Sequence, residues 1–306
     1  MRLVGVVFRA TAACLLAAAL SSAGAQDLDP GVDAAAAFEA ARKVQTRGPA
    51  DIPVGDQATL KLPEGYVFIP KVEGQQILRG MGDPGGDELV GLVFPSASGH
   101  WLAILRYVRD GHIADGGARE WDRDALLARL RKATREANTL RLSRGIRPLE
   151  VVGWAEPPQY SLDSHRLVWS AAIREQGAQA QSMGVNYNAF VLGRDSYISL
   201  VLVTDLEQLP AHKADAQRLL GATEFAPSHR YADFDRSTDT VAPYELTALV
   251  AGVAPDQPDR VAQLVASLAE HTALLTLAIV LSIAAGWGLV ELLLRRWSRR
   301  RSSKAL

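Results

Sequence analysis

The chain has 306 residues, with 33 basic and 34 acidic side chains, a net charge of −1 and a single cysteine. This length allows one large domain with added segments, or two domains. A lone thiol, Cys14, excludes intrachain disulfides and multi-thiolate metal sites. Basic side chains are concentrated at the two ends of the chain, so the part between them has an excess of acidic side chains and is a poor binder of nucleic acid.

The first 25 residues indicate an export signal. Arg2 and Arg9 flank the start of an apolar run over residues 10–20, and Ala23-Gly24-Ala25 provides small residues for cleavage. The alternative is an uncleaved anchor, but the run is short of the roughly 20 residues that cross a bilayer. We therefore expect residues 1–25 to be a signal peptide and the body of the protein to be exported without a thiol.

The exported part is predicted to contain one folded domain, residues 51–252, preceded by an Ala-rich helical segment within residues 26–50. Strand and helix patterns follow one another without regular alternation, so the fold class is α+β, an antiparallel sheet with packed helices. The order of elements is similar to that of PsbP-like α/β/α sandwiches, a likeness that implies no function. In chain order, we expect two short strands at 58–70, strands at 89–96 and 100–114, a helix at 121–145, hairpins at 149–175 and 185–205, and a helix at 209–225.

The helix at 121–145 carries the clearest pattern. Its apolar residues recur at intervals of three and four, Asp122 is placed to cap its N-terminus, and Gly145 to end it. The expected buried stripe consists of Leu126, Leu130, Ala133, Ala137 and Leu140.

The C-terminal region is predicted to cross a membrane once. Residues 253–271 are a linker and an amphipathic juxtamembrane helix, which starts at Pro258. Residues 272–294 form an apolar helix of about 35 Å, enough for a bilayer core of about 30 Å. The basic tail, 295–306, favours a cytoplasmic C-terminus. We therefore expect a single-pass protein of the bacterial inner membrane, with its body in the periplasm and the lipid bilayer in contact with residues 272–294.

One candidate site is an aromatic face on the first hairpin. Trp154, Glu156 and Tyr160 lie at even spacing on a strand and would share one face, with Trp169 across the hairpin. Aromatic rings beside a carboxylate could bind a sugar or a peptide. The alternative is cross-strand aromatic packing with Glu156 at a polar rim.

A second candidate is the stretch "HRYADFDRSTD", which contributes Tyr231, Asp233 and Asp235 as ligand or partner contacts. Its alternate acids imitate the start of a calcium loop, but Thr238 replaces the glycine and Tyr244 the final glutamate of such a loop. We therefore expect no metal. The glycines of "GMGDPG" precede a strand rather than a helix, so we expect no nucleotide cofactor either.

Five motifs carry a family resemblance. The sequence resembles a bacterial family of uncharacterised membrane-anchored proteins, domain of unknown function 2167, over about residues 50–252. The resemblance implies an export signal and a C-terminal membrane helix, and it implies no known activity. The motifs are "GHWLAILRYVRDGHIAD", "LLARLRKATREANTLRLSRG", "VVGWAEPPQYSLDSHRLVWS", "NYNAFVLGRDSYISLVLV" and "HRYADFDRSTDTVAPYELTALVAG".

Two functions follow as hypotheses. The first is an envelope interaction or sensing module with an envelope or membrane protein as its partner and no enzymatic activity. The alternative is an envelope hydrolase or carbohydrate-acting enzyme, in which Glu156 and a second acid such as Asp233 would lie about 5–9.5 Å apart. Convergence of Glu156, His165, Asp233 and Asp235 would favour the enzyme, and scatter would favour the module.

The predicted topology can be tested with two reporters on the full chain. A reporter fused after Leu306 should be cytoplasmic, because the basic tail is retained on that side. A Gly116→Cys variant should react with a membrane-impermeant thiol reagent from the periplasmic side. A C-terminal reporter that is active only outside the cytoplasm would contradict this placement.

Overall fold

The computed structural model describes residues 30–80, 85–97, 100–116, 118, 121–143, 147–177 and 183–251. The predicted signal peptide, juxtamembrane segment, membrane helix and basic tail therefore lie outside the described residues. Within the described ranges, no helix is long and apolar enough to cross a membrane.

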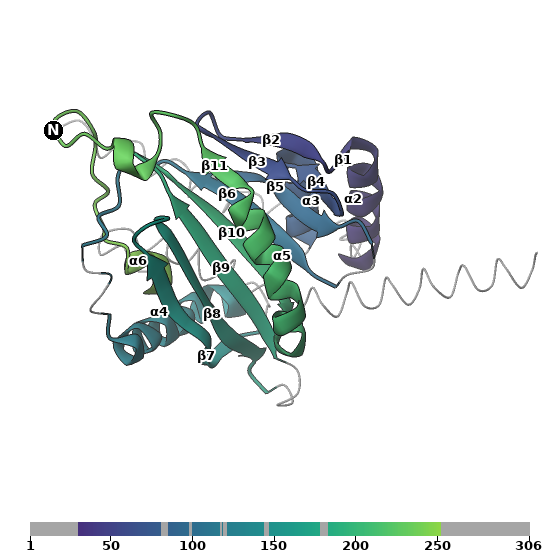
Figure 1. Cartoon of the computed structure of the whole chain (residues 1–306). Helices are drawn as coiled ribbons and strands as arrows, with labels where there is room; N and C mark the ends of the chain where they lie inside the picture. The colour runs from purple at the N-terminus through teal and green to yellow at the C-terminus, as the bar shows by residue number, and fades with distance from the viewer. Residues whose placement is uncertain are drawn as a thin grey trace, which may run out of the picture.

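An eight-stranded antiparallel sheet forms the centre of the domain (Figure 1). Both predicted hairpins are present, and they supply four adjacent strands at one side of this sheet. The prediction of an antiparallel sheet with packed helices is therefore confirmed. The strands, in spatial order, are β1 (Thr46–Arg47), β4 (Tyr66–Pro70), β5 (Leu89–Pro95), β6 (Leu102–Val108), β10 (Tyr197–Asp205), β9 (Gly184–Leu192), β8 (Arg166–Glu175) and β7 (Leu149–Ser161).

One face of the large sheet is covered by a second sheet and a helix. The second sheet consists of β11 (Thr223–Phe225), β3 (Ala58–Leu62) and β2 (Ala50–Val54). The helix is α5 (Leu209–Gly221), which follows the short helix η2 (Leu206–Gln208) and packs on β9 and β10. The two strands expected at 58–70 are both formed, but the turn at Gly65, with φ of 90°, sends them into different sheets.

The opposite face carries helices at its two ends. Helix α2 (Pro30–Val44) and helix α3 (Lys71–Gly80) pack on β4 and β5, whereas α4 (Arg123–Ser143) packs on β7 and on α6 (Ala248–Ala251). The cap predicted for α4 is confirmed, because the amides of Asp124 and Ala125 both donate to Asp122 Oδ1 at 3.0 Å. Four residues of its predicted stripe are buried: Leu126, Leu130, Ala133 and Ala137.

The chain after β11 forms a strap, residues 226–251, that returns across the loops of the large sheet to α6. It contains the short helix η3 (Tyr231–Asp233) and makes isolated bridges from Arg230 to Gly193 and from Val241 to His112. At its end, the indole of Trp169 donates to the carbonyl of Leu249 at 3.1 Å. The strap therefore closes the folded domain.

Docking of the strap requires a glycine at position 111. Gly111 has φ of 97°, and a Cβ there would lie 2.8 Å from Thr240 O and 2.9 Å from Ala242 N. Gly111→Ala should therefore lower the free energy of unfolding by about 1–3 kcal/mol, through backbone strain and displacement of the strap.

The matched control for this substitution is Gly116→Ala, where a Cβ would meet nothing within 4 Å. Urea denaturation of the full chain in detergent measures both variants. Equal effects of the two substitutions would show that the strap tolerates a side chain at position 111.

Candidate functional site

Four rings from three segments stack in a column, which we call the ring column: Phe234, His112, Tyr231 and His165. His112 lies between two strap rings, with centroids 3.7 Å from Phe234 and 4.4 Å from Tyr231. Tyr231 in turn stacks on His165 at 4.1 Å. The strap therefore places Tyr231 between two histidines that are far apart in sequence, and Phe234 on the other side of His112.

His112 is held in the column by its backbone and its ring. Its amide donates to Thr240 O, its carbonyl accepts from Ala242 N, and its Nδ1 lies 3.1 Å from the carbonyl of Arg194. A carbonyl can only accept, so Nδ1 carries the hydrogen of the neutral ring. Burial lowers the pKa of His112, although the bond to Arg194 and the nearby carboxylates of Asp115 and Asp239 oppose this shift.

At the other end of the column, His165 joins a hydrogen-bonded trio with Tyr160 and Asp115. Tyr160 Oη lies 2.8 Å from Asp115 Oδ2 and 3.1 Å from His165 Nδ1. The single phenol hydrogen goes to the carboxylate, so His165 Nδ1 donates to the phenol oxygen. Burial, followed by the bond to Asp115, raises the pKa of Tyr160, which therefore stays protonated in neutral solution.

The backbone conformation of His165 directs its ring toward the ring column. Its φ is 49°, the left-handed region in which histidine is more common than most residues. Its carbonyl accepts a bond of 3.0 Å from Leu192 N, which ties the β7–β8 turn to β9. The side chains of His165 and Asp115 remain 27% and 21% exposed, so protons and small groups can reach this end of the column.

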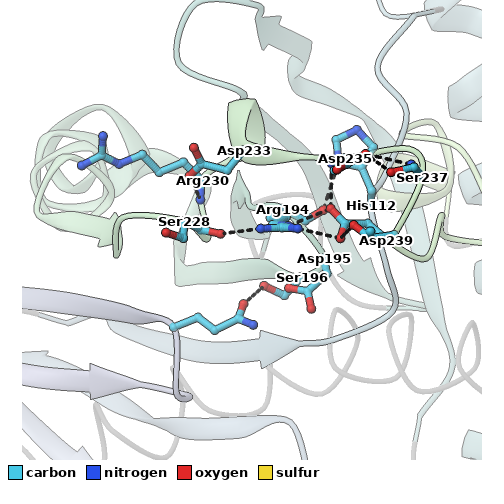
Figure 2. Close-up of polar contacts among 12 residues, drawn as sticks. His112, Arg194, Asp195, Ser196, Ser228, Arg230, Asp233, Asp235, Ser237 and Asp239 are labelled. Carbon is cyan, nitrogen blue, oxygen red and sulfur yellow. Dashed lines mark hydrogen bonds and ion pairs between the residues drawn. The ribbon is translucent and has the colours of Figure 1, made fainter.

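An ion pair fixes the strap beside the column (Figure 2). Arg194, in the β9–β10 turn, donates from Nε and Nη2 to the two carboxylate oxygens of Asp239 at 2.7 and 2.8 Å. Asp239 also accepts from the amide of Asp235 at 2.8 Å. The bonds from Arg194, then from Asp235, hold the pKa of Asp239 well below its usual range.

The other strap acids serve local turns. Asp233 accepts from the amide of Arg230 at 2.9 Å, and Asp235 accepts from the amide and hydroxyl of Ser237 at 2.9 and 2.7 Å. The alternate acids therefore do not wrap a common centre. In the described ranges, no group of three or more His, Cys, Asp or Glu side chains is placed to hold a metal ion.

The expectation that Trp154, Glu156 and Tyr160 share a face is wrong. The pairing of β7 with β8 shifts register between Trp154 and Glu156, and again before Gln159. Trp154 and Tyr160 pack with the α4 and α6 cluster, while Glu156 turns to the other face and pairs with Lys213 of α5 at 2.6 Å.

The predicted aromatic pair is a packing contact. Trp154 and Trp169 meet edge to face, with ring centroids 5.9 Å apart and planes at 80°. Their indole nitrogens donate to Arg123 O and Leu249 O, respectively, and Trp169 is only 1% exposed. This arrangement matches the cross-strand packing alternative.

The candidate residues therefore divide into two groups. The structure joins Tyr160 and Tyr231 to the ring column and its trio, but not Glu156, which is bound to α5. Glu156, His165, Asp233 and Asp235 do not converge.

Several residues of the site were missed as candidates from the sequence: His112, Asp115, Arg194, Phe234 and Asp239. The available signal was the position of "RDGHIAD" and "GRDS" directly after or between apolar strands. Strand ends on one side of a sheet bring such turns together, but the partner of each turn depends on the path of the strap.

Comparison with known proteins identifies a family and little else. A family model described as "Protein of unknown function (DUF2167)" matches residues 46–287. No curated protein matches the chain significantly. Among solved structures, the chain is similar to cyanobacterial PsbP (CyanoP) from Synechocystis sp. PCC 6803, with 10% identity, 60% of this chain and 91% of that chain covered, and a TM-score of 0.35.

The buried imidazole of His112 should make stability depend on pH. A histidine whose pKa is lower in the folded state gives full stability above the unfolded pKa of about 6.5, and stability falls as pH drops through that value. The unfolding free energy of the full chain should therefore fall between pH 7.5 and 5.5. In His112→Phe, which keeps an aromatic ring in the stack, the fall should be smaller.

In His112→Phe, the unfolding free energy should still depend in part on pH, because burial also lowers the pKa of His212. Gly116→Ala is the control, since it changes no titratable group and a Cβ there would meet nothing within 4 Å, so it should keep the slope of the parent. Urea denaturation at the two pH values measures each slope. Equal slopes in the parent and His112→Phe would contradict the assignment.

Proposed function

This chain belongs to the DUF2167 family of proteins of unknown function, and we propose that it is an envelope interaction or sensing module anchored in the bacterial inner membrane. Its exported domain would present the ring column to an envelope or membrane protein. Its C-terminal helix, residues 272–294, would hold the domain at the periplasmic face.

A single observation carries this proposal: the strap connects the ring column to the point where the chain leaves the domain. Tyr231 and Phe234 complete the column, and seventeen residues after Phe234 the same segment ends at Ala251 in α6. A partner that moves the strap rings would therefore act on the segment that leads to the predicted membrane helix.

The chemistry of the site suits a reversible contact. His165, Tyr160 and Asp115 lie together at partly exposed positions, where each can exchange a proton or a hydrogen bond with a partner, whereas His112 is buried behind Tyr231.

The contacts of the acids do not favour the alternative of an envelope hydrolase. Glu156 is bound to Lys213 on one face of the sheet, and Asp233 caps η3 in the strap. The pair of facing carboxylates required for that chemistry is not supplied by these two residues.

Partner contact can be tested by photo-crosslinking from Ser164, which is exposed beside His165. With a photoreactive residue at position 164, the full chain in its native membrane should give one discrete adduct. The same residue at Lys132, whose side chain is 73% exposed on α4, is the control and should give none. Equal adducts from both positions, or none from either, would contradict the proposal.

The Arg194–Asp239 pair should be needed for this contact. Arg194→Lys keeps the charge but cannot form the paired bonds to both oxygens, so the strap should loosen. We expect faster proteolysis within the strap and loss of the adduct from position 164. Arg147→Lys is the control, because Arg147 pairs with Glu175 as a 75% exposed side chain. An unchanged yield of the adduct from position 164 in Arg194→Lys would show that partner contact does not depend on the docked strap.

A further inference from the structure

Helix α4, at one end of the domain (Figure 1), carries basic side chains along its outer side. Arg129, Lys132 and Arg135 follow one another at intervals of three residues, so they lie on the same side of the helix, and we call them the basic stripe. All three are exposed, with 73% exposure for the side chain of Lys132. Leu142, seven residues after Arg135, continues this side of the helix and is 61% exposed.

The basic stripe is turned away from the core. Arg135 lies two residues from both Ala133 and Ala137, a rotation of about 200° in a helix with 3.6 residues per turn. Those alanines are buried in the cluster that joins α4 to the large sheet and α6. Solvent therefore meets the basic side of α4, while its apolar side packs on the domain.

The charge of the basic stripe is not balanced nearby. Helix α4 contains six basic and two acidic side chains, although acids outnumber bases in the part of the chain between its two ends. Lys132 pairs with Glu136 at 3.7 Å, but in the described part of the chain neither Arg129 nor Arg135 forms an ion pair. Arg135 also follows Arg131 by four residues and Lys132 by three, and such like-charge neighbours oppose helix formation.

The local structure of the helix does not account for these cations. The helix dipole favours cations in the last turn, where Arg141 lies, whereas the basic stripe occupies the middle of the helix. Arg131 illustrates a structural role, because its guanidinium donates to the carbonyls of Val151 and Val152 at 3.1 and 2.5 Å. Within the described ranges, the three residues of the stripe make no such bond to the backbone.

We propose that the basic stripe docks on the anionic phospholipid headgroups of the membrane. Lipid phosphates supply the missing counter-charge, and Leu142 reaches the boundary between headgroups and acyl chains. A fluid anionic surface suits long, mobile cations because it demands no fixed register. A protein interface is commonly centred on buried aromatic residues, and the stripe contains none.

This inference rests on the proposed function for the anchor at residues 272–294, and it deepens that function by naming lipid as a partner of the domain. Helix α4 packs on α6, the last described element before that predicted anchor. Each cation strengthens binding to an anionic surface about fivefold, so three give about a hundredfold. This gain is small for a free protein, whereas an anchor keeps the stripe near the surface at a high effective concentration. Docking therefore orients the domain reversibly, with α4 toward the bilayer.

Quenching of a dye on α4 by labelled lipid measures this contact. In a Cys14→Ser background, the dye is attached through Thr139→Cys, an exposed position between Arg135 and Leu142. The full chain is reconstituted in phosphatidylcholine vesicles with or without phosphatidylglycerol, each with a trace of lipid that carries a quencher on its headgroup. Phosphatidylglycerol should increase quenching, and about 1 M salt should abolish the increase because the Debye length falls to about 3 Å.

A second dye position reports on the other side of the domain. Gly221 ends α5, which packs on the opposite face of the large sheet, and a Cβ there would meet nothing within 4 Å. A dye attached through Gly221→Cys should show no increase in quenching with phosphatidylglycerol. An increase of the same size at both positions would overturn the proposed orientation.

Paired substitutions test the basic stripe itself. Arg129→Gln combined with Arg135→Gln should weaken the contact about twentyfold or more and abolish the increase at position 139. Arg42→Gln combined with Lys43→Gln is the matched control, because it removes the same charge from exposed positions on α2 and should keep the increase. Equal effects of the two pairs would overturn the inference. The lipid and salt dependence of the parent chain decides the question even if a variant folds poorly.

Other occupants of this side of α4 give different results. Quenching that is equal in both kinds of vesicle, or that resists salt, would show an apolar contact in place of an electrostatic one. Quenching that rises with the ratio of protein to lipid would make a second copy of the chain the occupant. Each of these results would overturn lipid docking.

An alkaline carbonate wash separates this inference from the proposed function, because it removes peripheral proteins from vesicles and leaves integral ones. A chain that is retained, but whose quenching ignores phosphatidylglycerol, would refute the docking and leave the anchored module in place. A chain that is released would refute the anchor. Salt-sensitive flotation of that chain with phosphatidylglycerol vesicles would then still support docking, and its absence would overturn it.

Discussion

The two central strands, β9 and β10, must be shielded from water on both faces, and the other elements are arranged around this requirement. Every residue of β9, and all but the last of β10, is buried. Burial of apolar surface is worth about 25 cal/mol per Å², so exposure of either face would cost more than most single contacts can offset. The second sheet and α5 cover one face, and helices from both ends of the domain cover the other.

The strap follows from the same requirement. Segment 226–251 brings Leu246, Leu249 and Val250 onto the second face, where they extend the cluster around Trp169. To reach that face, the chain must pass the strand ends, and its polar backbone needs partners there. The turn containing Arg194 and the loop containing His112 supply them. The site therefore lies where the strap passes over the loops of the sheet on its way to the second face.

Local sequence patterns predicted the parts of this structure that depend on near neighbours. The cap at Asp122, the stripe of α4 and both hairpins are set by residues a few positions apart, and each is present. Helix α3 was missed because Gly74 interrupts it, although that glycine allows close approach to β5, since a Cβ at position 74 would lie only 3.3 Å from the Leu92 side chain. The face of Glu156 was wrong because two register shifts in β7 break strict alternation.

The site could be predicted only in part, because its contacts join residues that are far apart in the chain. Tyr160 and Tyr231 stood out as aromatics among acids, but nothing local pairs Tyr160 with Asp115 or Tyr231 with His165. The acid that holds the strap is Asp239 rather than Asp233 or Asp235, since only Asp239 meets the fork of Arg194. The carboxylates of Asp233 and Asp235 accept hydrogen bonds within local turns instead.

Two titratable residues hold the strap in place: Asp239, which does so in its charged form, and His112, which does so in its neutral form. Asp239, with its pKa lowered by Arg194, stays charged through the neutral range, so the ion pair is constant there. His112, with its pKa lowered by burial, resists protonation only while the strap rings enclose it. Acid acts first on the histidine and only at much lower pH on the ion pair. The pH dependence expected near neutrality therefore comes from His112, and the bonds between Arg194 and Asp239 stay unchanged there.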